Sequence, residues 1–224
     1  MNLRSFIQPY SGTRDFGTLV AIDIDETIFK TFAEIKVIKD GKEIKSLTNQ
    51  EFNTYKLDEG ESFDFREFRN AELFKNTSIP IPKTIERIKR MMKGIMEKGS
   101  PDVILLTARA DFDDKHTFLQ TFRENDIPID DIYVERAGNM TTGTTDERKK
   151  AIITKYLMTG KYTDIKLIDD DHRNVLSFSR MGKCLDQEIY DRVREVHQLA
   201  NDDMVTIHFF PLLVDEDGDL KRVW

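Results

Sequence analysis

Polar, mostly acidic residues follow three short apolar runs, and their positions are the first indication of chemistry in this chain. The three stretches are residues 23–27, 105–109 and 167–171. A folding core gains nothing from carboxylates at these points, and clustered carboxylates repel one another unless a cation or a proton lies between them. The pattern therefore predicts a divalent metal and a phosphate held together at one edge of a sheet.

The first stretch carries two carboxylates, Asp23 and Asp25, separated by Ile24 at the end of an apolar strand. Two carboxylates with separate roles suit phosphoryl transfer: one attacks phosphorus, and the other protonates the leaving oxygen and later activates water. Such a pair alone is a weak signal, because surface loops also carry it. Asp215 and Asp217 are an example, and we expect them to be solvated.

The second stretch ends in Thr107, Ala108 and Arg109, which we assign to substrate binding. The Thr107 hydroxyl can donate to a phosphate oxygen beside backbone N–H groups, and a guanidinium can bind phosphate with two parallel hydrogen bonds. Taken alone, Thr107 is typical of an ordinary strand end and Arg109 of a surface ion pair.

Lys149 and Lys150 lie in the first turns of an expected helix and supply a candidate cation for the nucleophile and the phosphate. Lys149 shares the apolar face of Ile152 and Ile153, and Lys150 is nearly as well placed. The sequence does not separate them, and lysine is also common on solvated helix faces.

The third acidic stretch, residues 169–171, contains three consecutive carboxylates that cannot all face one direction. Asp169 and Asp170 are our candidate metal ligands together with Asp23 and Asp25, and Mg²⁺ is the expected ion because it favours hard oxygen ligands. Of the three, one carboxylate is expected to cap the following helix. Asn174 is a candidate to support the metal through a water molecule.

Apolar runs and helical patterns alternate along most of the chain, which predicts an α/β fold with a parallel sheet covered on both faces. Ligands bind at the carboxyl ends of the strands in such sheets, where the three motif stretches lie. Strands are expected at residues 18–22, 103–106, 131–134, 165–168 and 205–210, the last one stopped by Pro211. Helices are expected around residues 85–96, around residues 118–122 after an acidic start at 111–114, and from a capping box at Thr144 to Leu157. A long segment after Arg173 is also expected to be helical, at least around Ile189, Val193 and Val196.

Residues 32–79 interrupt this alternation. Asp40-Gly41 between two β-rich runs is a strong hairpin signal, and an aromatic, helical patch is expected to follow it, from Phe63 to Phe74. We interpret residues 32–79 as a small insertion and residues 1–31 and 80–224 as the core. The alternative is a meandering edge of the main sheet.

Composition narrows the class of protein. The chain has 224 residues, 39% of them hydrophobic and 33% charged, with a net charge of −7, which argues against a broad electrostatic contact with nucleic acid. The single cysteine of the chain excludes an internal disulfide framework. No apolar run has the length of a membrane span, and residues 1–10 lack the apolar core of a signal peptide. A cytoplasmic location is the expectation.

In order and spacing, the motifs resemble those of the haloacid-dehalogenase-like (HAD) hydrolase superfamily. Residues 23–27 look like its first motif, Asp-x-Asp-x-Thr; Thr107 looks like the second, Lys149 or Lys150 the third, and Asp169-Asp170 the fourth. The resemblance implies a Rossmann-like three-layer fold with a small cap after the first strand. It also implies Asp23 as nucleophile, Asp25 as general acid and base, and Mg²⁺ held by Asp23, the Asp25 backbone carbonyl and a fourth-motif carboxylate.

Two finer resemblances concern the substrate. The order of residues 107–109 and the later Asp pair is similar to the phosphatase domain of polynucleotide kinase/3′-phosphatases, and the chain also looks like HAD hydrolases of tailed bacteriophages. The expected activity is phosphomonoester hydrolysis, on a phosphorylated small molecule such as a nucleotide or on a nucleic-acid end. No membrane or protein partner is indicated. The alternatives are a receiver-type signalling module and a non-catalytic phosphate-binding protein.

Overall fold

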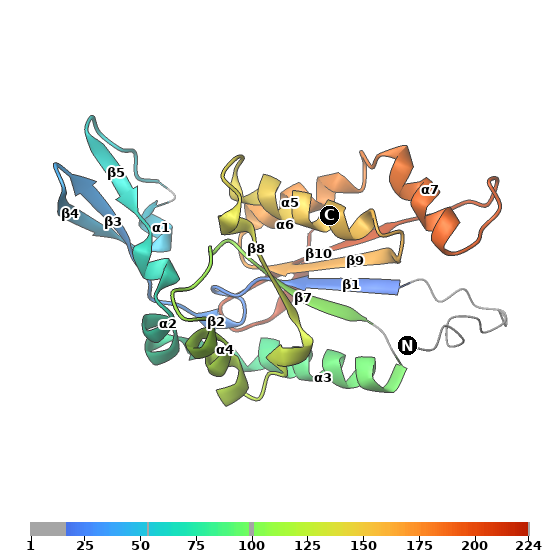
Figure 1. The fold of residues 1–224 in the computed structure, drawn as a ribbon, viewed down its shortest axis with the longest axis horizontal. Helices are drawn as coiled ribbons and strands as arrows, with labels where there is room; N and C mark the ends of the chain where they lie inside the picture. Colours follow the sequence, from blue (N-terminus) through green and yellow to red (C-terminus); the bar gives the residue numbers. More distant parts are fainter. Residues whose placement is uncertain (1–16, 53, 99–100, 224) are drawn as a thin grey trace.

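A six-stranded, mostly parallel sheet forms the centre of the protein in a computed structural model that describes residues 17–52, 54–98 and 101–223 (Figure 1). Its strand order is β11-β10-β9-β1-β7-β8, and only β11 runs antiparallel to its neighbour. The strands are β1 (Gly17–Ile22), β7 (Asp102–Thr107), β8 (Tyr133–Arg136), β9 (Tyr162–Asp169), β10 (His208–Val214) and β11 (Leu220–Arg222).

The parallel strands follow the order 3-2-1-4-5 when they are numbered along the chain from β1. This is the order of Rossmann-like sheets, and it places β1 where the chain turns from one half of the sheet to the other. The first strand therefore ends in the crevice where such sheets bind ligands. The predicted α/β class with a mostly parallel sheet is confirmed.

Helices cover both faces of the sheet, which gives three layers (Figure 1). In β1, Val20 and Ile22 pack on one face, while Leu19 and Ala21 pack on the other. A strand buried on both sides reads as a continuous apolar run, as this one does. The face of Val20 is covered by α3 (Pro82–Lys98) and α4 (Lys115–Glu124); the opposite face is covered by α5 (Thr145–Leu157), α6 (His172–Met181) and α7 (Gln187–Val196).

Local signals set the starts of these helices. Asp114 caps α4 by accepting from the backbone N–H groups of His116 and Thr117, and Thr144 opens α5 with a capping box closed by Glu147. The segment after Arg173 forms two helices, because α6 ends at Met181 and α7 begins six residues later at Gln187. The helix predicted around Ile189, Val193 and Val196 is confirmed as α7. In the described residues, no helix has both the length and the apolar character needed to cross a membrane.

Two strand predictions are corrected. Residues 131 and 132 precede β8, which begins at Tyr133 after the 3₁₀ turn η3 (Ile129–Asp131). Pro211 does not stop the last parallel strand but lies inside β10, opposite Leu167 of β9. The carbonyl of Pro211 accepts from Val223 N at 3.0 Å and so points toward the β11 side of the strand. The nitrogen of Pro211 faces the same side, next to the first residue pair between β10 and β11. A proline is tolerated there because no ladder hydrogen bond is lost.

The insertion forms its own three-stranded sheet, in the order β4-β3-β5, and does not extend the edge of the main sheet (Figure 1). Its elements are β3 (Ile35–Lys39), β4 (Lys42–Leu47), α1 (Asn49–Phe52), β5 (Glu61–Asp64) and the 3₁₀ turn η2 (Arg66–Arg69). Asp40 and Gly41 both have positive φ, at 51° and 72°, so the predicted hairpin is confirmed.

The aromatic patch expected in the insertion divides between two clusters. Phe63, which lies in β5 and not in a helix, packs with Phe68 against a small apolar cluster under the three-stranded sheet. Phe74, in α2 (Ala71–Thr77), instead contacts Phe29 and Phe118 in the main core. A short antiparallel pair, β2 (Phe29–Lys30) with β6 (Ile79–Pro80), joins the two ends of the segment.

Candidate active site

The first acidic motif lies in a tight turn directly after β1. The backbone N–H of Asp23 donates to Ile168 O at 2.9 Å and so continues the ladder between β1 and β9 by one residue. The carbonyl of Ile24 then accepts from Ile28 N, which reverses the chain, and Glu26 takes a left-handed conformation with φ of 53°. Such a conformation costs free energy in a residue other than glycine and concentrates at functional sites.

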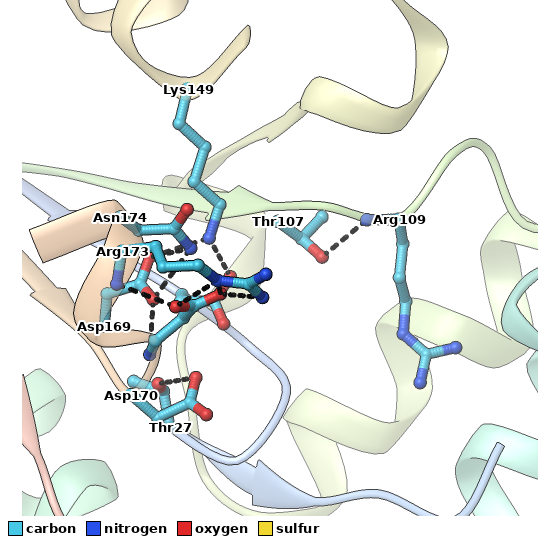
Figure 2. Close-up of polar contacts among 10 residues, drawn as sticks. Thr27, Thr107, Arg109, Lys149, Asp169, Asp170, Arg173 and Asn174 are labelled. Carbon is cyan, nitrogen blue, oxygen red and sulfur yellow. Dashed lines mark hydrogen bonds and ion pairs between the residues drawn. The ribbon is translucent and has the colours of Figure 1, made fainter. Parts of the chain in front are cut away.

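Lys149 decides which carboxylates form the centre of the site. Its ammonium lies 2.7 Å from Asp23 Oδ1 and 2.7 Å from Asp169 Oδ2, and its side chain is only 3% exposed. Figure 2 shows it reaching from α5 toward Asp169 at the end of β9. Lys150 is half-buried, and no contact joins it to the described acidic residues of this cluster. Lys149 is thus the member of the pair that the fold brings to the site.

Asp169 is held by the protein itself. Each of its two oxygens accepts two hydrogen bonds: Oδ1 from Asp171 N and Asn174 Nδ2, both at 3.0 Å, and Oδ2 from Lys149 and from Asn174 at 3.2 Å. Asn174, which was predicted to support the metal through a water molecule, therefore donates directly to the Asp169 carboxylate. The carboxylate of Asp170 accepts only a long hydrogen bond, from the Thr27 hydroxyl at 3.5 Å. Within the described part of the chain, Asp170 is thus held less firmly by hydrogen bonds than Asp169.

Asp171 has a different task. It is the N-cap of α6 and accepts from Arg173 N at 2.8 Å, which confirms that one member of the acidic triplet caps the following helix. Its carboxylate also pairs with the Arg173 guanidinium at 2.8 Å. His172, which adjoins the triplet, is exposed at the first position of the helix.

Three carboxylates of the site suit a divalent cation. One oxygen each of Asp23, Asp169 and Asp170 lies within 4.8 Å of the others. When all three are ionised they carry −3, and the Lys149 ammonium offsets one charge, so the remaining −2 matches one divalent ion. Hard oxygen donors of this kind favour Mg²⁺ or a similar ion.

The pKa values of two of these carboxyls, Asp23 and Asp170, report the same excess of negative charge. Burial raises the pKa of Asp23 well above its usual range; Lys149 opposes this, while Asp169 and Asp170 add to it. Burial and the neighbouring Asp169 raise the pKa of Asp170 to about 7. A bound cation would remove this penalty, because it stabilises the ionised carboxylates.

Asp25 belongs to a separate, self-neutral pair. Arg109 Nη2 lies 2.6 Å from Asp25 Oδ1, and Nε lies 2.9 Å from Oδ2, while the Thr31 hydroxyl donates to Oδ1 at 2.7 Å. Burial opposes ionisation of Asp25, but Arg109 outweighs it and the pKa is lowered. The Asp25 side chain is thus directed to Arg109, and it is not among the three carboxylates that converge on the candidate metal position.

The predicted substrate-binding residues lie at the end of β7. Thr107 is buried and accepts from Arg109 N at 3.0 Å, an interaction drawn in Figure 2. This leaves its hydroxyl hydrogen free to be donated, as phosphate binding requires. Ala108 is exposed beside it. Arg109 does form an ion pair, the alternative that we had considered for it, but the pair is buried and lies inside the site.

Sequence reasoning missed two contributors to the site. Thr31 lies six residues after Asp25, beyond the motif, and nothing in its neighbourhood marks it. Phe68 contributes its backbone carbonyl, which accepts from Arg109 Nη1 at 2.9 Å, and a backbone acceptor has no residue-type signal. Comparisons of the chain with protein-family models, curated proteins and solved structures found no match in any of the three.

Proposed function

We propose that this protein is a Mg²⁺-dependent phosphomonoesterase of the HAD type that works through a phosphorylated Asp23. The observation that carries the proposal is the position of the Lys149 ammonium, 2.7 Å from both Asp23 and Asp169 at the carboxyl ends of β1 and β9. Several buried carboxylates around one lysine destabilise a fold, so their presence indicates a site whose charge is completed by ligands.

In the first step, an Asp23 carboxylate oxygen attacks the phosphorus atom and the bond from phosphorus to the leaving oxygen breaks. Asp25 gives its proton to that oxygen, so the alcohol leaves neutral. In the second step, Asp25 takes a proton from water, the water oxygen bonds to phosphorus, and the bond from phosphorus to Asp23 breaks. Inorganic phosphate leaves and both carboxyls return to their starting states.

The surrounding residues bind and orient the phosphate. Lys149 holds the nucleophile and offsets charge, and the Thr107 hydroxyl donates to a phosphate oxygen. Asp23 and Asp170 would hold the metal with the Asp25 carbonyl, while Asp169 keeps Lys149 in place. When bound, Mg²⁺ supplies positive charge between the carboxylates and the phosphate oxygens. Arg109 keeps Asp25 ionised before substrate binds, so Asp25 must take up a proton when the phosphate binds. The negative charge of the bound phosphate favours this protonated form, and the second step restores it.

The alternative of a receiver-type module is disfavoured by the sheet. Receiver-like flavodoxin folds have the strand order 2-1-3-4-5, whereas the parallel strands here run 3-2-1-4-5. The substrate class remains as proposed from the sequence: a phosphorylated small molecule such as a nucleotide, or a nucleic-acid end.

The test is hydrolysis of para-nitrophenyl phosphate by the wild-type protein with Mg²⁺ and with EDTA. Activity should need the metal and should disappear in Asp23→Asn. Asp217→Asn is the matched control, because Asp217 is an exposed acid of a similar Asp-x-Asp pair in the hairpin between β10 and β11. Full activity in Asp23→Asn, or none in the wild type across aryl, nucleotide and oligonucleotide phosphates, would refute the proposal.

A further inference from the structure

Arg109 makes contacts that do not suit the phosphate-binding role suggested by its position in the sequence. We infer that Arg109 is a positioning residue that aims the Asp25 carboxyl at the leaving oxygen, and that it does not bind the phosphate. The inference rests on the proposed phosphatase function and deepens it. It makes the protonation of the leaving group, and not the affinity for phosphate, the property that depends on Arg109.

The guanidinium is enclosed on its edges and its faces. Two of its nitrogens bind Asp25, and Nη1 donates to Phe68 O at 2.9 Å. Its central carbon lies 4.8 Å from the ring centre of Phe68, 5.1 Å from that of Phe74 and 5.4 Å from that of Phe112. With the side chain only 2% exposed, a phosphate reaches this cation only by breaking the ion pair.

The contacts of Asp25 identify the oxygen that handles the proton. Oδ1 accepts from the Thr31 hydroxyl and from Nη2 of Arg109, and it shares the single Nε hydrogen of Arg109 with Oδ2. Among the described residues, Oδ2 has a single hydrogen-bond partner, Arg109 Nε at 2.9 Å. A carboxylate oxygen has two lone pairs, so Oδ2 keeps one available. Arg109 and Thr31 therefore fix the plane of the carboxyl group and leave Oδ2 as the proton-transfer atom.

The backbone around Arg109 is held firmly enough to serve as a support. Arg109 N donates to Thr107 Oγ1 at 3.0 Å, and Arg109 O accepts from Gly138 N at 3.2 Å. Gly138 packs so closely that an added Cβ would lie 2.4 to 2.5 Å from backbone atoms of residues 108–110. Phe68 O adds a contact from the insertion, so two segments distant in sequence hold Arg109: Gly138 holds its backbone and Phe68 its guanidinium.

A positioned general acid has a distinct kinetic signature. An alkyl alkoxide is a poor leaving group and needs its proton as the bond to phosphorus breaks, whereas para-nitrophenolate leaves without one. Loss of Arg109 should therefore penalise an alkyl phosphate much more than para-nitrophenyl phosphate. General acid catalysis is typically worth about 10²–10⁴-fold, and we expect a selective loss of about 10²-fold on the alkyl ester.

The experiment measures kcat/KM for both esters with Mg²⁺, because this ratio covers only the steps up to departure of the leaving group. We expect Arg109→Gln to lose about 10²-fold on the alkyl phosphate and little on the aryl phosphate, with an unchanged inhibition constant for inorganic phosphate. Arg109→Lys should restore part of the loss, because it keeps the charge but not the two-point contact. Arg123→Gln is the matched control, since Arg123 forms a similar two-point pair with Asp130 on the exposed surface.

Thr31→Val provides a second route if the Arg109 variants fail to fold. It removes the other hydrogen bond to Oδ1 and should shift the alkyl-to-aryl ratio in the same direction by a smaller factor. Equal losses on both esters, or weaker inhibition by phosphate, would overturn the inference and leave the phosphatase proposal intact. An inactive wild type would overturn the proposed function, and this inference with it.

Discussion

Replacing Lys149 by methionine should separate the two lysines that the sequence left equivalent. Methionine keeps an unbranched chain of similar length but removes the ammonium that contacts Asp23 and Asp169, each at 2.7 Å. Three neighbouring carboxylates would then lie at the end of the sheet without a protein cation. The expected result is a large loss of stability, greatest when no metal is present.

The size of the effect follows from burial. Lys149 is 3% exposed, Asp169 is fully buried, and breaking a buried pair by removing one partner costs about 3–5 kcal/mol. For a chain of this length, about 1 kcal/mol shifts the melting temperature by about 2–4 °C, so the metal-free variant should melt about 6–20 °C lower. Hydrolysis of an aryl phosphate should fall by about 10²–10³-fold, as when one charge-stabilising donor is lost.

Thermal unfolding in EDTA and in saturating Mg²⁺ tests this reasoning, with Lys150→Met as the matched control. Lys150 is the neighbouring, half-buried lysine, and its replacement should change stability by no more than about 0.5 kcal/mol. Mg²⁺ should recover part of the Lys149→Met deficit, because the ion supplies positive charge to the same carboxylates. If Lys149→Met in EDTA melts as high as Lys150→Met, the buried cluster does not depend on its lysine and the reasoning is wrong.

Four further outcomes are expected. In Asp25→Asn, aryl phosphate should still phosphorylate Asp23, so a burst of phenolate followed by slow turnover is expected in stopped-flow absorbance, and a rate without a burst would contradict the proposed division of roles. Mg²⁺ at about 100 times its dissociation constant should stabilise the wild type by about 2.7 kcal/mol in calorimetry; Asp170→Asn should lose this gain and Asp171→Asn, which alters a helix cap, should keep it. Gly138→Ala should cost about 1–3 kcal/mol in denaturant unfolding, because its Cβ would meet backbone 2.4 Å away, and an unchanged midpoint would refute that packing. Burial and a hydrogen bond to Asp102 raise the pKa of Tyr162, so stability should fall as the pH rises above about 10, where the unfolded chain loses this proton first; Tyr162→Phe should flatten the fall, and an identical profile would exclude this group.

Local patterns determined much of the fold before any tertiary information. The apolar runs before Asp23, Thr107 and Asp169 predicted three central strands, because a strand buried on both faces leaves a continuous apolar signature. The hairpin at Asp40-Gly41 was predicted equally clearly. A two-residue hairpin turn of this kind needs positive φ at both central residues, and an Asp-Gly pair adopts that conformation readily. The prediction that the last parallel strand stops at Pro211 was wrong. Only the position of β11 shows that no hydrogen bond of the sheet requires an N–H at this residue.

The candidate site shows the same division. Residue types and spacing alone indicated acidic strand ends with a lysine and a threonine, because parallel strands bring their carboxyl ends to one edge. Tertiary structure chose Lys149 over Lys150, since one residue along a helix turns a side chain by about 100° and only one of them meets the crevice. It also turned Arg109 toward Asp25, because the Phe68 carbonyl and the rings of Phe68 and Phe74 come from a distant segment. Together with the nearby ring of Phe112, they enclose the guanidinium there. Sequence thus determined which groups are available, and long-range packing decided which of them are neutralised, which remain free, and toward which partner each one points.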